Sequence, residues 1–190
     1  MITPGGLRSA RFLAVGTGLR ILLTPVVMGL CLAGGSTAET VGAILFCVAA
    51  GTDWLDGRLA RRWGVTTKLG SFLDTTADKL LVTGVLFALV SVDRASPWIA
   101  GLIICREIVI MGLRGVIAAD GTVMAPSALG KLKTAVQFLA ISLAIVRVGD
   151  PVAGLYVDQW AMLVAAVITV ASAVDYLLRS ASSLSLGANR

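Results

Sequence analysis

Histidine is absent from the 190-residue sequence. Because histidine is a frequent general base and the commonest metal ligand, its absence excludes HExxH zinc sites and Glu-x-x-His di-iron bundles. Any proton transfer must therefore use Asp, Glu, Lys, Tyr or Cys. Cysteine is scarce too, and Cys31, Cys47 and Cys105 lie in apolar runs without paired spacing. We expect buried thiols and no disulfide framework.

Charged residues are also few. They make up 14% of the chain, whereas 57% of the residues are hydrophobic and the mean hydropathy is +0.90. A soluble domain usually carries about 25% charged residues. The composition therefore indicates an integral membrane protein, and about 20 apolar residues per crossing leave room for six spans. The net charge of +5 favours anionic headgroups and phosphorylated substrates over nucleic acid.

Glycine, proline and charged residues divide the chain into six apolar segments. We expect one all-α domain over residues 1–190: a short N-terminal interfacial helix at 1–11, six transmembrane helices within 12–178, and a frayed Ser-rich tail at 179–190. The expected spans are about 12–33, 40–63, 69–92, 98–118, 130–146 and 152–178. Residues 36–38 (STA) resemble a signal-peptide cleavage site, but Arg20 and the length of the first apolar run favour a retained helix.

The basic residues are distributed unequally between the two ends of these spans. One side has only Arg94 and Arg147. By the positive-inside rule, both termini and the end of the second span are then cytoplasmic, which in a bacterial cell means the inner membrane. The basic residues on the other, cytoplasmic side are Arg8, Arg11, Arg58, Arg61, Arg62, Lys68, Arg114, Lys131, Lys133, Arg179 and Arg190.

The stretch from residue 53 to 78 (DWLDGRLARRWGVTTKLGSFLDTTAD) holds four carboxylates between two apolar runs. Ionised residues inside membrane spans are costly and are kept mainly for function. Helical spacing places Asp53, Asp56, Gly57, Ala60 and Arg61 on one face of the second span, and Gly70, Asp74 and Asp78 on one face of the third. A short turn makes the two helices antiparallel neighbours, so the four carboxylates converge.

Four neighbouring carboxylates need cations to stay ionised, because like charges raise one another's pKa. Two divalent ions would balance them, and all-oxygen ligands favour magnesium, manganese or calcium over zinc or iron. Two such ions are a common device for phosphoryl chemistry. The small residues Gly57, Ala60 and Gly70 leave space for a bulky ligand, and Arg61 can bind a diphosphate.

The same stretch fits the pattern D-x2-D-G-x2-A-R-x8-G-x3-D-x3-D at all eight specified positions. It resembles the signature of the CDP-alcohol phosphotransferase family. That resemblance implies six transmembrane helices, a homodimer, and two-metal (Mg²⁺ or Mn²⁺) transfer of a substituted phosphoryl group from a CDP-linked donor to an alcohol. It assigns the metal ions to Asp53, Asp56, Asp74 and Asp78, with Asp78 also as general base. It assigns CDP binding to Asp53, Asp56, Gly57, Ala60, Arg61, Gly70 and Asp74.

A second polar cluster follows in the fourth and fifth spans. We expect Arg106, Arg114, Lys131 and Lys133 to bind the phosphate of an acidic acceptor, with Glu107 and Arg20 in supporting roles. The alternative is that the lysines are interfacial anchors and that Arg106 and Glu107 only pair within the bundle. The segments ICREIVIMGLRG and GKLKTAVQ resemble those of family members that use glycerol 3-phosphate as acceptor and CDP-diacylglycerol as donor.

Other functions remain open at this point. Members of the same family use inositol phosphate or phosphatidylglycerol as acceptor, and positive charge alone does not separate glycerol phosphate from inositol phosphate. A divalent cation transporter would also place acidic residues in the membrane, but it gives no role to Gly57, Ala60 and Arg61. A structural scaffold held by polar contacts is disfavoured, because such contacts contribute only about 1 kcal/mol each.

Overall fold

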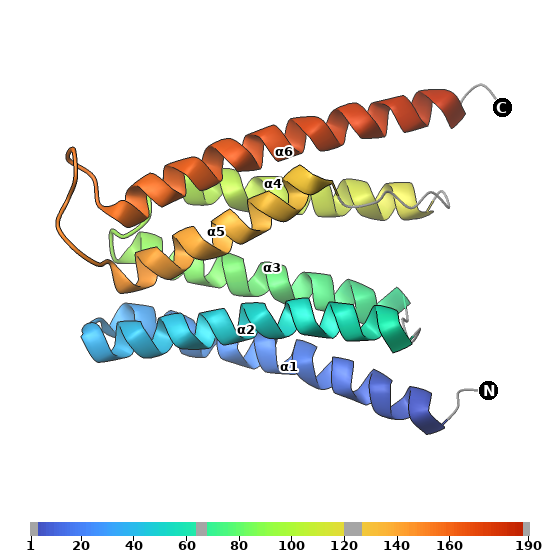
Figure 1. Ribbon diagram of the computed structural model, residues 1–190, viewed down its shortest axis with the longest axis horizontal. Helices are drawn as coiled ribbons and strands as arrows, with labels where there is room; N and C mark the ends of the chain where they lie inside the picture. Colours follow the sequence, from blue (N-terminus) through green and yellow to red (C-terminus); the bar gives the residue numbers. More distant parts are fainter. Residues whose placement is uncertain (1–3, 64–67, 120–126, 188–190) are drawn as a thin grey trace. The chain divides into compact units, whose positions relative to one another are not determined.

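The computed structural model describes the backbone of residues 4–63, 68–119 and 127–187, and the side chains of residues 16–52, 73–118 and 127–180. Apart from one isolated β-bridge, its regular elements are helices, which confirms the predicted all-α class. The helices are α1 (Pro4–Ala33), α2 (Ser36–Trp63), α3 (Lys68–Ser91), α4 (Pro97–Ala119), α5 (Ala128–Val146) and α6 (Val157–Gly187) (Figure 1).

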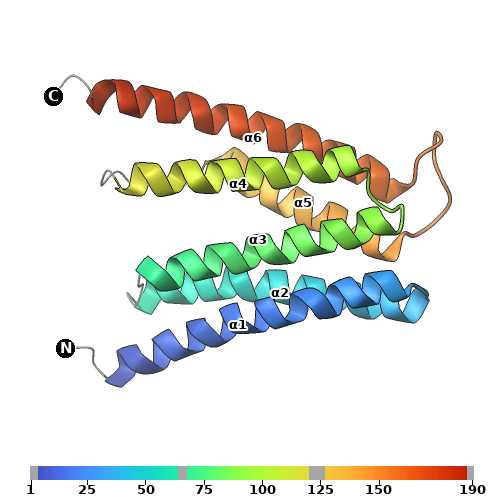
Figure 2. The ribbon, with the colours of Figure 1, turned by 180° about the vertical axis from the view of Figure 1, so that it is seen from behind.

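The helices divide into two compact units. The first contains α1, α2 and α3 with residues 144–146, and the second contains α4, α6 and most of α5. In the first unit α1 packs along both α2 and α3 (Figure 2). In the second, α4 packs against α6. The prediction of a single domain stays a prediction.

Gly84 of α3 allows α1 and α3 to approach closely. A Cβ atom at this position would lie 2.8 Å from both Met28 Sδ and Thr24 Cγ2 on α1. The Met28 side chain can move aside, but Thr24 is held in its rotamer because its Oγ1 donates to the carbonyl oxygen of Arg20 at 2.9 Å. The missing side chain of Gly84 therefore sets the spacing of the two helices.

Gly84→Ala is expected to destabilise the fold by about 1–3 kcal/mol through overpacking. Gly101→Ala in α4 is the matched control, because a Cβ atom there meets nothing within 4 Å. That control should be neutral or slightly stabilising, since alanine has the higher helix propensity. Thermal unfolding in detergent measures both variants, and equal midpoints would contradict the proposed close approach.

Two glycines in left-handed conformation join α1 to α2. Gly34 has φ 66° and Gly35 has φ 89°, values that glycine adopts without steric cost. The beginning of α2 is then held by an ion pair between Glu39 in its first turn and Arg94, which follows α3. This contact fixes one end of the α1–α3 unit.

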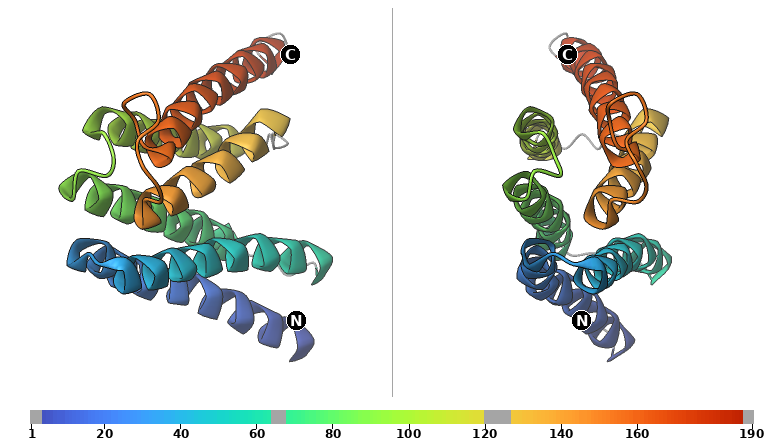
Figure 3. Two further views of the ribbon diagram at one scale, coloured as in Figure 1. Left: turned by 60° about the vertical axis from the view of Figure 1, so that its left-hand side comes forward. Right: turned by 90° about the vertical axis from the view of Figure 1, so that its left-hand side faces the viewer.

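The connection from α5 to α6 differs from the prediction. The sixth helix was expected to begin near 152 but begins at Val157. Val152 and Leu155 form a β-bridge around Ala153 (φ 54°) and Gly154 (φ 81°), so residues 152–155 make a tight turn. Tyr156 then donates its N–H to Oε1 of Gln159 (2.9 Å). Figure 3 shows this connection as an extended loop.

The two ends of the chain also differ from the expectation. Pro4–Ala33 is one continuous helix, so a separate interfacial helix at 1–11 is not confirmed, and Pro25 lies inside the helix without ending it. At the other end, α6 continues to Gly187, so residues 179–187 are helical rather than frayed. Residues 1–3 and 188–190 lie outside the described part.

Three helices contain stretches that are long and apolar enough to cross a membrane: Gly16–Ala33, Ala128–Val146 and Val157–Ser180. The apolar stretch of α2, Ser36–Thr52, is shorter. Within the described residues α3 and α4 do not qualify, since they carry Asp74, Asp78 and Lys79, and Arg106, Glu107 and Arg114. The chain is a membrane protein, and the count of six spans stays a prediction.

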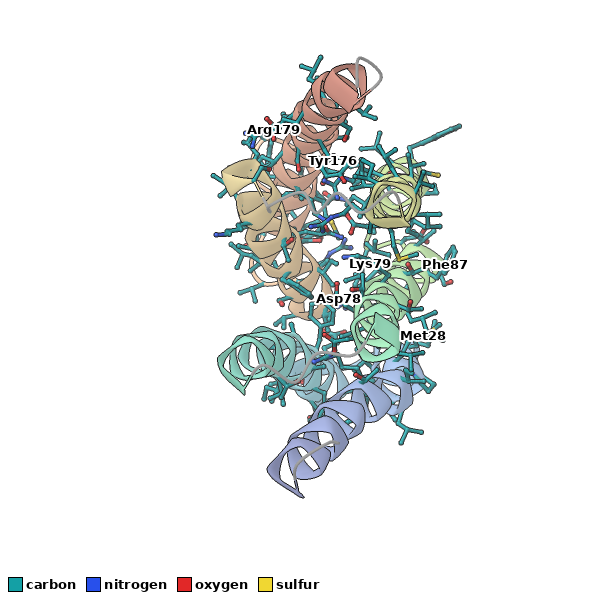
Figure 4. The ribbon with its side chains drawn as sticks, turned by 90° about the vertical axis from the view of Figure 1, so that its right-hand side faces the viewer. Met28, Asp78, Lys79, Phe87, Tyr176 and Arg179 are labelled. Carbon is teal, nitrogen blue, oxygen red and sulfur yellow. The ribbon has the colours of Figure 1, made fainter. Side chains whose placement is uncertain are left out.

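Large apolar side chains on the outer faces of the helices agree with a lipid environment. Leu22 of α1 and Val167 of α6 are each 69% exposed, and Phe87 of α3 is 57% exposed. Figure 4 shows Phe87 on the outer side of its helix.

Candidate active site

The aspartate motif lies on α2 and α3 of the first unit. The two helices run antiparallel, as predicted from the short turn between them (Figure 1). Asp74 and Asp78 on α3 have described side chains, whereas the side chains of residues 53–72 lie outside the described part. The roles assigned to Asp53, Asp56, Gly57, Ala60, Arg61 and Gly70 therefore stay predictions.

Asp74 is held by two side chains from α1. Nη1 of Arg20 donates to Oδ1 of Asp74 at 2.6 Å, and Oγ1 of Thr17 donates to the same oxygen at 3.3 Å. The Arg20 side chain is 1% exposed and that of Asp74 is 34% exposed. The supporting role predicted for Arg20 thus has a definite partner, and Thr17 is a contact that the sequence analysis missed.

Arg20 also reaches α2. Its Nε donates to the carbonyl oxygen of Ala49 at 3.3 Å, and Oγ1 of Thr52 donates to the same carbonyl at 2.8 Å. Ala49 lies one helical turn before Asp53. One buried guanidinium therefore joins α1, α2 and α3 next to both parts of the aspartate motif.

Asp78 has a cationic neighbour on its own helix. Nζ of Lys79 donates to Oδ2 of Asp78 at 2.8 Å, and the Asp78 side chain is 14% exposed. Figure 4 shows both residues on α3. Lys79 directly follows the motif in the sequence, but nothing in the motif indicated this contact.

The chemistry of the described donors fits a hard divalent cation. Asp74 and Asp78 offer only carboxylate oxygens, the ligand type that magnesium and manganese prefer. Both hydrogen bonds to Asp74 go to Oδ1, so among the described side chains Oδ2 has no hydrogen-bond or ion-pair partner. No group of three acidic, His or Cys residues gathers among the described side chains, and those of Asp53 and Asp56 lie outside the described part.

A second polar cluster lies in the second unit. Oε1 of Glu107 on α4 accepts hydrogen bonds from both Nη1 of Arg106 (3.1 Å) and Nζ of Lys133 on α5. Nη2 of Arg106 donates to Oγ of Ser172 on α6 at 2.8 Å. Glu107, Lys133 and Ser172 are almost completely buried. Two cations and one carboxylate leave a net positive charge inside the bundle.

The structure separates the four predicted phosphate-binding cations into two kinds. Arg106 and Lys133 meet at Glu107, whereas Arg114 and Lys131 are exposed and have no contact with this cluster among the described side chains. Ser172 was missed by the sequence analysis, because one serine in an apolar helix carries no distinctive signal. Glu107, predicted only as a supporting residue, is the carboxylate that joins the two cations.

Comparison with known proteins identifies the family. The family model described as CDP-alcohol phosphatidyltransferase matches residues 14–171. The chain belongs to this family. The match begins within α1 and ends within α6, so it includes both polar clusters. Enzymes of the family are generally dependent on divalent metal ions.

Curated relatives from several bacteria are similar over most of their length. A Bacillus subtilis (strain 168) protein is 37% identical over 190 residues, which cover 95% of this chain and 96% of the relative. A Salmonella choleraesuis protein is 39% identical, covering 85% and 90%, and a Shigella flexneri protein is 38% identical, covering 88% and 93%. All three are named CDP-diacylglycerol–glycerol-3-phosphate 3-phosphatidyltransferase.

Proposed function

We propose that this protein transfers the phosphatidyl group of CDP-diacylglycerol to glycerol 3-phosphate, giving phosphatidylglycerol phosphate and CMP. The observation that carries the proposal is the complete aspartate motif on α2 and α3 in a chain 37–39% identical to relatives named for this reaction. The buried positive cluster at Arg106 and Lys133 supports a phosphorylated acceptor over a neutral one.

In this reaction a hydroxyl oxygen of the acceptor attacks the phosphorus that carries diacylglycerol, and the bond from this phosphorus to the CMP oxygen breaks. Asp78 takes the hydroxyl proton, since a chain without histidine must use another base. Lys79, 2.8 Å from Oδ2 of Asp78, holds that carboxylate in place. Gly57, Ala60, Arg61 and Gly70 line the CDP pocket, together with Asp53, Asp56 and Asp74.

Two divalent ions, Mg²⁺ or Mn²⁺, would be held by Asp53, Asp56, Asp74 and Asp78. When bound, they would stabilise negative charge on the diphosphate and on the departing CMP. Arg20 keeps Oδ1 of Asp74 occupied, so the carboxylate presents Oδ2 in a fixed orientation. Substitution of a residue that orients a metal ligand in this way commonly lowers metal affinity by about 10–100-fold.

Arg106 and Lys133 would bind the acceptor phosphate. Lys133→Gln is expected to lower kcat/KM for glycerol 3-phosphate by about 100-fold, because a hydrogen bond to a charged group contributes about 1.5–3 kcal/mol. Lys131→Gln is the matched control on the same helix, and its exposed side chain should leave kcat/KM within about threefold of the unaltered enzyme. Equal losses in both variants would contradict the assignment of phosphate binding to the buried cation.

The distribution of basic residues supports a cytoplasmic location, at the inner membrane, for both termini and for the mouth of the aspartate site. Cytidine nucleotides and glycerol phosphate are cytoplasmic compounds, so the substrates and the site are on the same side. The family resemblance further supports six membrane-spanning helices and a homodimer, and we include both in the proposal. Reporter fusions at each terminus test the topology, and cross-linking in native membranes tests the dimer.

Release of CMP from CDP-diacylglycerol by the purified protein in mixed micelles tests the proposed reaction. Release should require both glycerol 3-phosphate and Mg²⁺ or Mn²⁺, and chelation of the metal should abolish it. Mass spectrometry should detect phosphatidylglycerol phosphate in amounts equal to the CMP released. Undiminished release after complete chelation would contradict the two-metal proposal.

A further inference from the structure

Unsatisfied polar atoms gather between two helices of the second unit. Among the described residues, five buried side-chain nitrogen or oxygen atoms have no hydrogen-bond partner. All five belong to α4 or α6. Oδ1 of Asp158 lies in the first turn of α6, and the other four are Nε of Arg106 on α4 and Oγ1 of Thr169, Oδ2 of Asp175 and the hydroxyl of Tyr176 further along α6. These two helices pack against each other.

Three hydroxyl groups share one face of α6. Thr169, Ser172 and Tyr176 stand at positions i, i+3 and i+7, which places them on a single stripe along the helix. We call these three residues the hydroxyl stripe. Ser172 accepts a hydrogen bond from Arg106 at 2.8 Å, so the stripe lies against α4. Figure 4 shows Tyr176 on the side of α6 nearest α4.

The hydroxyl stripe differs from ordinary helix serines and threonines in a membrane. Ser142 and Ser180 each donate to the carbonyl oxygen four residues earlier, at 2.8 Å, which satisfies the hydroxyl within its own helix. Thr169 is 0% exposed and makes no such bond within the described residues. Because a buried polar group without a partner is costly, the stripe is better explained by a ligand than by helix packing.

The surroundings define what that ligand must offer. Hydroxyl groups donate and accept, so they bind other hydroxyls well, while Arg106 and Lys133 beside them attract an anion. We propose that the hydroxyl stripe binds the free, non-reacting hydroxyl of the acceptor, whose phosphate is held by Arg106 and Lys133. The proposal rests on the proposed function and adds residues that select the acceptor.

Two acceptors that differ by one hydroxyl group test this proposal. Glycerol 3-phosphate carries a C2 hydroxyl, and 3-hydroxypropyl phosphate lacks it while keeping the phosphate and the terminal hydroxyl. We expect the unaltered enzyme to prefer glycerol 3-phosphate by about 100-fold in kcat/KM, because a site built to bind a hydroxyl discriminates against the analogue without it. In Tyr176→Phe and in Thr169→Val, the preference should fall below about tenfold, with the loss confined to glycerol 3-phosphate.

Ser180→Ala is the matched control on the same helix, since its hydroxyl is already bonded to the Tyr176 carbonyl. It should keep the full preference. Two results in Tyr176→Phe and Thr169→Val would overturn the proposal and leave the hydroxyl stripe a structural feature. One is an equal loss of kcat/KM for both acceptors, and the other is an unchanged preference for glycerol 3-phosphate. Failure of the unaltered enzyme to release CMP with glycerol 3-phosphate would instead overturn the proposed function. Thermal unfolding of each variant separates misfolding from lost recognition.

Discussion

Asp78→Asn is expected to lower the rate of CMP release by about 10³-fold, while Mn²⁺ binding weakens only about tenfold. Asparagine has nearly the same shape as aspartate but cannot accept the proton of the acceptor hydroxyl, and general-base catalysis contributes about 10²–10⁴-fold. Asparagine keeps one side-chain oxygen, which can still accept a hydrogen bond from Lys79, whose Nζ lies 2.8 Å from Oδ2 of Asp78 in the native chain. Single-turnover CMP release measures the chemical step, and electron paramagnetic resonance measures bound Mn²⁺.

Asp93→Asn provides a control with the same change of charge. Asp93 has φ 55°, a conformation that asparagine also tolerates, and it lies in the turn after α3, at the far end of that helix from the motif. This variant should keep both its rate and its Mn²⁺ binding. If Asp78→Asn instead released CMP at near-native rates, another group would have to be the base.

The second large effect is expected at Arg20. Arg20→Gln should weaken Mn²⁺ binding by about tenfold or more, because Asp74 loses the partner that orients it. The same change should destabilise the fold by about 3 kcal/mol, since it breaks an ion pair in which the arginine is 1% exposed. Mn²⁺ titration followed by electron paramagnetic resonance and thermal unfolding without metal measure the two effects separately.

Arg179→Gln is the comparison variant, because it also removes an arginine from an ion pair. The Arg179 side chain is 57% exposed and pairs with Asp175 on the same helix, so its loss should cost about 0.5 kcal/mol and leave Mn²⁺ binding unchanged. An Arg20→Gln protein that was less stable but bound Mn²⁺ with native affinity would show that Arg20 only holds the helices together.

The arginine beside Asp74 also bears on the cation-transporter alternative. A permeating divalent ion would pass within a few ångströms of a fixed guanidinium that donates to Asp74 at 2.6 Å. Because like charges repel strongly in a low-dielectric interior, this arrangement disfavours an ion path. It suits a site that binds metal and an anionic diphosphate together.

Most helix boundaries could be predicted from the sequence because apolar runs end at glycine, proline or charged residues. Gly34 and Gly35 mark the end of α1, and Pro97 opens α4. The predicted start of α6 was wrong because the backbone there adopts a conformation that its residue type disfavours. Ala153 takes φ 54°, which alanine rarely adopts, so its residue type gave no sign of the turn that delays α6 to Val157.

The candidate site was only partly predictable for a similar reason. Helical spacing is local, so it placed Asp74 and Asp78 on one face of α3. The partner of Asp74 is Arg20, 54 residues earlier in the chain, and spacing within one helix says nothing about such a contact. Likewise Glu107 meets Lys133 across 26 residues, and Ser172 meets Arg106 across 66. These pairings depend on how the helices pack.

Acceptor competition is the most direct measurement of the proposed activity. The purified protein is given labelled CDP-diacylglycerol, Mg²⁺, and equal concentrations of glycerol 3-phosphate, inositol phosphate and phosphatidylglycerol. The label is expected to appear in phosphatidylglycerol phosphate, with one CMP released for each product molecule. Label in the inositol phosphate product or in cardiolipin, or no CMP release with any acceptor, would contradict the proposed function.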